Sequence, residues 1–277
     1  MVAARNAAPG RGAAPKTPPR RVLLAAAAAA LACLPCGPGA AADAGTARFG
    51  GGPEYEHCLG LLRGDPDGAL LFASGWEASG GGDGARHCAA LSLLALGETE
   101  LGAERLEDLA RRSGAAAAAR AAVFAEAGHA WTLAGETDRA FAAATMALTL
   151  APDDPALLLD RAFALGATGR YAEAVEDLDR ALATEPSRAE AWALRGAAKR
   201  QLGRTEEAER DVARALSLAP RNTDALLERA ALRRAKGDVR GARADWERVA
   251  RLAPDSAAGD LAQQNLELNP APKQRKR

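Results

Sequence analysis

GRYAEAVEDLDRALATEP, the stretch from Gly169 to Pro186, has the pattern of one amphipathic helix between a glycine and a proline. Its apolar or small side chains recur at spacings of three and four residues: Tyr171, Ala174, Val175, Leu178, Ala181 and Leu182. That spacing places them along one stripe of an α-helix. Gly169 suits the turn that closes a preceding helix, and Pro186 cannot continue this one. We therefore predict a helix between these two residues.

The same pattern returns at a fixed interval, equal to the separation of Gly169 and Gly203. Each unit has a glycine at the turn, an alanine five residues later and a proline at its end: Gly135, Gly169, Gly203 and Gly237; Ala140, Ala174, Ala208 and Ala242; Pro152, Pro186, Pro220 and Pro254. Four units that share one period indicate a repeat protein. Because one helical pair cannot bury its own apolar face, neighbouring pairs must stack.

Each unit also contains an earlier helix. Leu158, Ala162 and Leu165 fall on one side of it, and Asp154 before Pro155 suits a helix start. Alanine dominates the composition and aromatic residues make up only 4%, which favours helix over sheet. The sequence therefore predicts an all-α protein built from helical pairs.

These units resemble the tetratricopeptide repeat, a helix-turn-helix unit of about 34 residues. That family's pattern is a large apolar residue, a small one four positions on, and later alanine, an apolar residue, alanine and proline. The unit 189–222 carries them as Trp192, Gly196, Ala208, Val212, Ala215 and Pro220. The resemblance implies a right-handed α-solenoid with repeats at 121–154, 155–188, 189–222 and 223–256.

Weaker helical patterns flank the four repeats. Leu96 to Ala110 imitates Ala134 to Leu148 at an offset slightly longer than the repeat period, so we expect a degenerate, repeat-like N-terminal cap over 45–120. A polar-faced helix at 257–269 would cover the last repeat, as solenoids require. The basic residues of 270–277 predict a disordered tail.

Three repeats carry an arginine where the family has leucine, and an aspartate sixteen residues later: Arg161 and Asp177, Arg195 and Asp211, Arg229 and Asp245. The remaining repeat has alanine at both places, Ala127 and Ala143. We interpret each pair as an ion pair that bridges the helices of one repeat, or one repeat to the next, because the arginine fork suits a carboxylate. The alternative is a ladder of arginines for an acidic ligand.

The N-terminus has the order of a secretory signal peptide, which we predict over 1–44. A basic lead ends at Arg21, an apolar run covers 22–34, and small residues follow. The run is too short to span a bilayer comfortably. Cleavage is expected after Ala42 or Ala44, and a lipid anchor at Cys33 or Cys36 is the alternative. The low share of lysine among the basic residues favours a GC-rich bacterial genome, and hence a periplasmic or secreted protein.

The chain from Asp43 onward retains 31 basic and 36 acidic residues, a net charge of about −5, which gives no support to nucleic-acid binding. It also retains two cysteines, Cys58 and Cys88, each preceded by a histidine. An isolated pair in an oxidising compartment predicts a disulfide. Two free thiols and a metal site of two histidines and two cysteines are the alternatives. Adjacent residues on a helix point about 100° apart, which disfavours the metal site.

Signals of catalysis are sparse. The three histidines are His57, His87 and His129, and no nucleophile elbow, zinc-protease motif, phosphate loop or dinucleotide fingerprint occurs. We therefore expect a protein that is not an enzyme and uses no cofactor or catalytic metal.

The resemblance implies a concave groove lined by the first helix of each pair, where a partner's segment can lie. The candidate groove residues are His129, Thr132, Phe163, Glu190, Arg200, Asp224 and Arg234. Chaperone-binding members of the family hold a carboxylate terminus in a clamp of lysine and asparagine. That clamp is absent, because the matching positions hold Ala125, His129, Leu159, Phe163 and Ala193.

Two classes of function fit these observations. The first is a non-enzymatic scaffold of the bacterial envelope that binds a protein partner in the groove. The second is an accessory protein of envelope polysaccharide or lipid assembly that binds polymer directly. Exposed aromatic residues on the inner wall would favour the second, and Trp131 and Phe163 are its candidates. We expect a monomer that binds no nucleic acid and does not span the membrane after signal cleavage.

Overall fold

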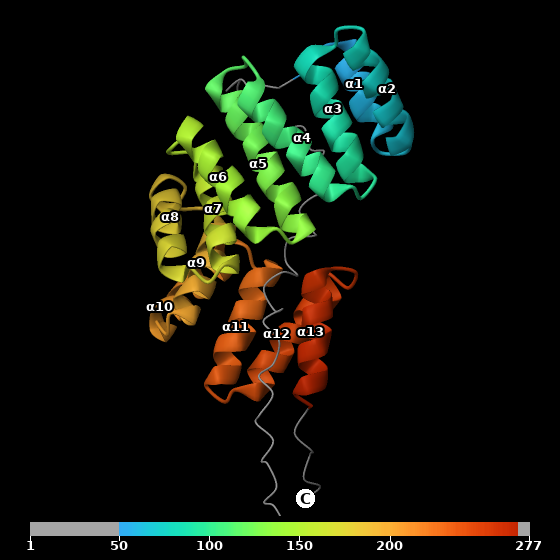
Figure 1. The fold of residues 1–277 in the computed structure, drawn as a ribbon. Coiled ribbons are helices and arrows are strands. Elements are labelled where there is room, and N and C mark those ends of the chain that lie inside the picture. The colour runs from blue at the N-terminus through green and yellow to red at the C-terminus, as the bar shows by residue number, and fades with distance from the viewer. Residues whose placement is uncertain (1–49, 271–277) are drawn as a thin grey trace, which may run out of the picture.

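The computed structural model describes residues 50–270, and these residues form thirteen α-helices and no strand (Figure 1). The helices are α1 (Pro53–Leu61), α2 (Pro66–Ala78), α3 (Gly82–Ala95), α4 (Thr99–Arg112), α5 (Ala117–Ala134), α6 (Thr137–Leu150), α7 (Pro155–Ala167), α8 (Tyr171–Thr184), α9 (Ala189–Gln201), α10 (Thr205–Leu218), α11 (Thr223–Ala235), α12 (Val239–Leu252) and α13 (Ala257–Leu268). The all-α solenoid is confirmed. The expected signal peptide, with Cys33 and Cys36, and residues 271–277 of the expected tail lie outside the described residues.

The helices are arranged as antiparallel pairs joined by short glycine turns. In the four repeats, the turn glycine has a positive φ between 76° and 85°, a left-handed conformation that glycine adopts without a steric penalty. Gly97, between α3 and α4, has the same conformation with φ 86°. The pair α3–α4 therefore has the same turn as the four repeats, although its spacing departs from their period.

Small residues let the two helices of a pair approach closely. A Cβ atom added to Gly196 of α9 would lie 2.7 Å from Val212 Cγ2 and 3.3 Å from the carbonyl oxygen of Ala208 in α10. The equivalent positions Ala162 and Ala230 are fully buried. Larger residues fill the space on either side of the contact, among them Leu158, Leu165, Leu178, Val212, Leu226 and Val249. The core is thus a continuous seam between stacked pairs.

The array curves from α1–α3 at one end to α11–α13 at the other (Figure 1). From α5 to α13, the first helix of each pair packs against the first helix of the next pair. Successive second helices in the described part of the chain make no comparable contact. Because the first helices are the closer set, they lie on the inside of the curve.

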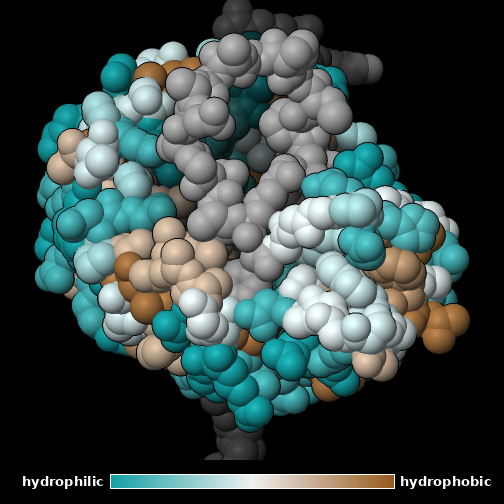
Figure 2. Space-filling model, turned by 90° about the horizontal axis from the view of Figure 1, so that it is seen from above, coloured by the Kyte–Doolittle hydropathy of each residue, from teal (hydrophilic) through white to brown (hydrophobic). Residues whose placement is uncertain are grey.

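Seen from the end of the array that carries α1–α3, the surface is mixed: hydrophilic residues cover much of it, and hydrophobic residues form separate patches between them (Figure 2). Among the described residues, no helix combines the length and the apolar character that crossing a bilayer requires.

The three predicted arginine–aspartate pairs lie at the seam between the helices of one repeat. In each, the arginine Nε and Nη2 donate to the two carboxylate oxygens, at 2.6–3.0 Å: Arg161 to Asp177, Arg195 to Asp211, and Arg229 to Asp245. The aspartates are buried. The guanidinium forks are therefore turned toward carboxylates of this chain, and not toward the site of an acidic ligand.

Each of the three aspartates has a second cation nearby, which is distant at Asp177 (Arg180 Nη1 at 3.9 Å) and close in the other two pairs. Arg195 Nη1 also donates to Asp179, at 2.6 Å, and Asp179 lies in the preceding repeat, so this arginine ties two repeats together. Lys199 Nζ lies 2.9 Å from Asp211. Arg233 Nη1 donates to Asp245 at 2.7 Å. Asp211 and Asp245 thus each meet two cations, which offsets part of their desolvation.

A disulfide between Cys58 and Cys88 joins α1 to α3. The neighbouring histidines have other contacts: His57 packs edge-on against Phe72, and His87 contacts Tyr55. Among residues 50–270, no group of histidine, cysteine or carboxylate side chains is placed to hold a metal ion.

The network at Arg195 predicts unequal effects for its two aspartates. Asp211→Ala leaves two half-buried or buried cations without their shared carboxylate, so we expect a loss of about 3 kcal/mol in the free energy of unfolding. Asp179→Ala removes an exposed partner of the same arginine and should cost about 0–1 kcal/mol. Urea unfolding followed by circular dichroism measures both, and equal losses would contradict the assignment.

Candidate functional site

The candidate site is the inner wall, which we define as the concave side of α5, α7, α9 and α11. Residues in equivalent positions recur on it once in every repeat. One row holds Glu126, Asp160, Leu194 and Glu228, a second holds His129, Phe163, Ala197 and Ala231, and a third includes Glu190 and Asp224. Polar contacts between successive first helices run along this side. The wall is thus lined mainly by carboxylates and by small or apolar residues.

His129 of α5 contacts the next first helix. Its Nε2 lies 2.9 Å from Asp160 Oδ1 of α7. The hydrogen bond to Asp160 raises the pKa of His129 above the usual value near 6.5, and the charges of Asp160 and Glu126 add to the effect. The charged imidazole is therefore favoured, with Asp160 as its direct partner.

Arg200 of α9 makes the equivalent link to α11. Its Nε and Nη2 donate to the two carboxylate oxygens of Glu228, at 2.6 and 3.3 Å. Asp224 lies one turn away on α11, with Glu190 of α9 also near. Desolvation within the groove, followed by the charges of Glu228 and Glu190, raises the pKa of Asp224. Three carboxylates, those of Glu190, Asp224 and Glu228, thus lie near one another, and the single positive charge of Arg200 cannot neutralise them all.

Two buried residues of the N-terminal helices contact Glu126 of the inner wall, one directly and one through the other, and the sequence did not predict these contacts. Tyr55 Oη of α1 lies 2.6 Å from Nδ1 of the buried His87, and His87 Nε2 lies 2.5 Å from Glu126 of α5. The three side chains connect α1, α3 and α5. The repeat period does relate Glu126 to Asp160 and Glu228, and that relation was the available signal for these carboxylates.

The other predicted groove residues have distinct surroundings. Phe163 is half-buried. Thr132 donates its hydroxyl proton to the carbonyl of Gly128, within its own helix. Arg234 is exposed and donates from Nε to Asn269 Oδ1, at 2.9 Å, at the end of α13. The wall therefore continues onto the capping helix.

The suggestion that Trp131 is an aromatic residue of the inner wall is wrong. Trp131 is fully buried, and its indole N–H donates to Glu107 of α4 at 2.9 Å. Arg139 covers its ring, with the guanidinium carbon 3.5 Å from the ring centroid. The side chain packs α5 against the preceding pair, because α4 occupies the place of a second helix there.

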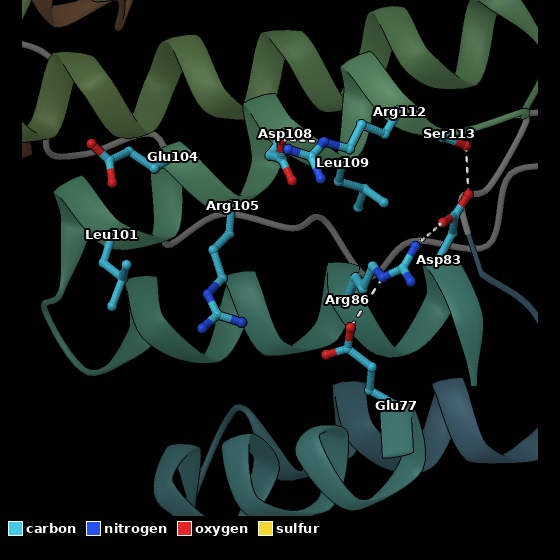
Figure 3. A pocket seen from close by; sticks show the side chains of 10 residues that line it. All are labelled: Glu77, Asp83, Arg86, Leu101, Glu104, Arg105, Asp108, Leu109, Arg112 and Ser113. Carbon is cyan, nitrogen blue, oxygen red and sulfur yellow. Dashed lines mark hydrogen bonds and ion pairs between the residues drawn. The ribbon is translucent and has the colours of Figure 1, made fainter. Parts of the chain in front are cut away.

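A second concavity, a cleft of about 570 Å³, lies beside α4 on the N-terminal part of the chain (Figure 3). Ion pairs line it: Arg86 donates to Glu77 and Asp83, and the buried Ser113 donates its hydroxyl proton to Asp83. The residues around the cleft include no histidine or cysteine. Most of its charged side chains are paired with one another, as structural ion pairs are, although Arg105 is not.

Comparisons with known proteins agree with this architecture. Two family models, both described as tetratricopeptide repeat, match residues 134–199 and 189–222. A comparison with curated protein sequences finds no match.

Two solved structures with TM-scores above 0.5 are similar in fold. A tetratricopeptide repeat protein from Parabacteroides merdae aligns with TM-score 0.60 and 14% identity, over 78% of this chain and 84% of its own. The Cut9–Hcn1 hetero-tetramer of APC/C aligns with TM-score 0.59 and 18% identity over 77% of this chain, which spans 42% of the matched chain. The first repeat domain of Spaghetti (RPAP3), solved with an HSP90 peptide, has 32% identity and TM-score 0.40, over 42% of this chain and 93% of its own.

The contact between His129 and Asp160 predicts a pH-dependent stability. Since the folded pKa of His129 is raised, the contribution is fully present below the unfolded pKa of about 6.5 and is lost as pH rises through the folded pKa. Asp160→Asn should therefore destabilise more at pH 5.5 than at pH 8.5, and NMR titration should show a lower pKa for His129. Asp138→Asn, an exposed change on α6, is the control, and an unchanged His129 titration in Asp160→Asn would refute the contact.

Proposed function

We propose that this chain, which belongs to the tetratricopeptide repeat family, is a non-enzymatic scaffold that holds a segment of a partner protein against its inner wall. Tetratricopeptide repeats commonly serve as scaffolds for protein–protein interactions. The observation that carries the proposal is the continuity of the inner wall from α5 to α11. A segment that lay there would meet side chains from four successive first helices.

The small side chains on the C-terminal part of the inner wall favour a partner segment that binds in an extended conformation. Ala197 and Ala231 occupy the positions that hold His129 and Phe163 in the first two repeats, so the wall is lower over α9 and α11. Glu190 and Asp224 are exposed there. Small residues flanked by exposed charged ones leave space for a backbone and offer polar contacts to it.

Binding of a protein partner is favoured over direct binding of polysaccharide or lipid. A sugar polymer would be expected to stack on aromatic residues of the wall. Trp131 is buried in the seam and Phe163 is half-buried, so the described wall offers little such surface.

Photo-crosslinking tests where the partner lies. A photoreactive amino acid placed at Ala197 or Ala231 should give a discrete crosslinked protein in native envelopes. Ala183 and Ala213, exposed on the second helices α8 and α10, are the matched controls and should give little product. Equal yields at the four positions would contradict binding in the groove, and a crosslinked glycan in place of a protein would favour the polymer reading.

We also propose export to the bacterial envelope, supported by the basic, apolar and small-residue order of 1–44. The mature protein should begin at Asp43 or Gly45 on N-terminal sequencing, and Cys58 and Cys88 should resist alkylation until reduction. An acylated Cys33 or Cys36 at the N-terminus would replace cleavage by lipid anchoring. An intact Met1 with two freely alkylated thiols would refute export.

A further inference from the structure

We infer that the inner wall over α9 and α11 takes a basic segment, an extended stretch of the partner that carries lysine or arginine side chains between apolar ones. This inference rests on the proposed function and specifies the chemistry of the partner. Two observations support it. The inner wall has more carboxylates than cations, and some of these carboxylates have no partner within the described chain.

Carboxylates outnumber cations on the inner wall. The wall carries five carboxylates, Glu126, Asp160, Glu190, Asp224 and Glu228, against the two guanidiniums of Arg200 and Arg234 and the imidazole of His129. Three of the five lie at the same position of their repeats. They therefore lie in one row along the groove, in the first, second and fourth repeats, and Leu194 takes the place of a carboxylate in the third.

The existing partners divide these carboxylates into two groups. Glu126, Asp160 and Glu228 contact His87, His129 and Arg200 respectively. Glu190 and Asp224 make no hydrogen bond or ion pair with another described side chain, and both are exposed. The negative charge open to a ligand is thus concentrated over α9 and α11.

Helix capping accounts for only part of this pattern. Glu190 and Asp224 lie in the first turns of their helices, where acidic residues complement the helix dipole. The first turn of α7 carries no acidic residue, however. Glu228 follows Asp224 by one further turn and adds charge of the same sign to the same place. Desolvation is the main cause of the raised pKa of Asp224, and the nearby charges of Glu228 and Glu190 add to it; a bound cation would oppose both effects.

Apolar side chains alternate with the carboxylates. Leu194 and Leu227 are half-buried on the same two helices, next to the small Ala197 and Ala231. An extended segment points successive side chains to opposite faces, so it can place basic groups on the carboxylates and apolar groups on the leucines. The wall is poorly suited to an acidic segment, because Arg200 and Arg234 already donate to Glu228 and Asn269.

Fluorescence anisotropy tests the preference with two labelled peptides, AKLRAKLRAK and its acidic counterpart AELEAELEAE. The mature chain should bind the basic peptide, more weakly at higher salt, and should not bind the acidic one. The double variant Glu190→Gln/Asp224→Asn should weaken binding of the basic peptide about tenfold, as expected when two charge contacts in a partly shielded groove are removed.

The matched control is Glu176→Gln/Glu206→Gln, the same change of charge at exposed positions of α8 and α10. It should change the dissociation constant less than twofold, and thermal melts should show that both double variants fold. Equal weakening by the two double variants, or equal binding of the two peptides, would overturn the inference. If crosslinking at Ala197 and Ala231 still traps the partner in Glu190→Gln/Asp224→Asn with undiminished yield, the groove function stands and its basic preference fails.

The basic residues near the C-terminus, Lys273, Arg275, Lys276 and Arg277, carry the same charge as the proposed segment. A chain in which these four are replaced by glutamine should bind the basic peptide at least as tightly as the wild type. Loss of binding in that variant would show that the peptide's site is not the inner wall and would contradict the inference.

Discussion

The close approach of two helices at one small residue in each repeat is the contact on which the rest of this structure depends. At Gly196 the neighbouring helix lies so near that a methyl group would collide with Val212. A β-branched side chain on α10 has little freedom to move aside. The contact therefore sets the angle between the two helices of the pair. Because the next pair packs against both of them, that angle also determines how the next pair is placed.

The inner wall follows from that geometry. Tightly paired helices bring successive first helices together on one side, where His129 reaches Asp160 and Arg200 reaches Glu228. The same stacking buries Asp177, Asp211 and Asp245 between helices, where arginine is the partner that satisfies both carboxylate oxygens. The charged residues at the seam are thus paired with one another and stabilise the fold, whereas Glu190 and Asp224 on the inner wall have no such partner.

The sequence predicts contacts within a repeat better than contacts between repeats. The repeat period was enough to place each arginine opposite an aspartate sixteen residues on, because both belong to one rigid pair. The contacts of Arg200 with Glu228 and of His87 with Glu126 depend on the rotation between neighbouring helical pairs. The spacing of residues in the sequence does not give that rotation. Trp131 was misplaced for a related reason: the break of register before it concealed that α4 supplies its partner, Glu107.

Hydrogen–deuterium exchange of the mature chain, with and without a bound partner segment, tests the central claim most directly. If the inner wall is the binding site, backbone amides of α9 and α11 should gain protection when the segment binds, and those of α8 and α10 should change little. Protection centred on α2–α4, beside the cleft of Figure 3, or on the second helices would contradict it.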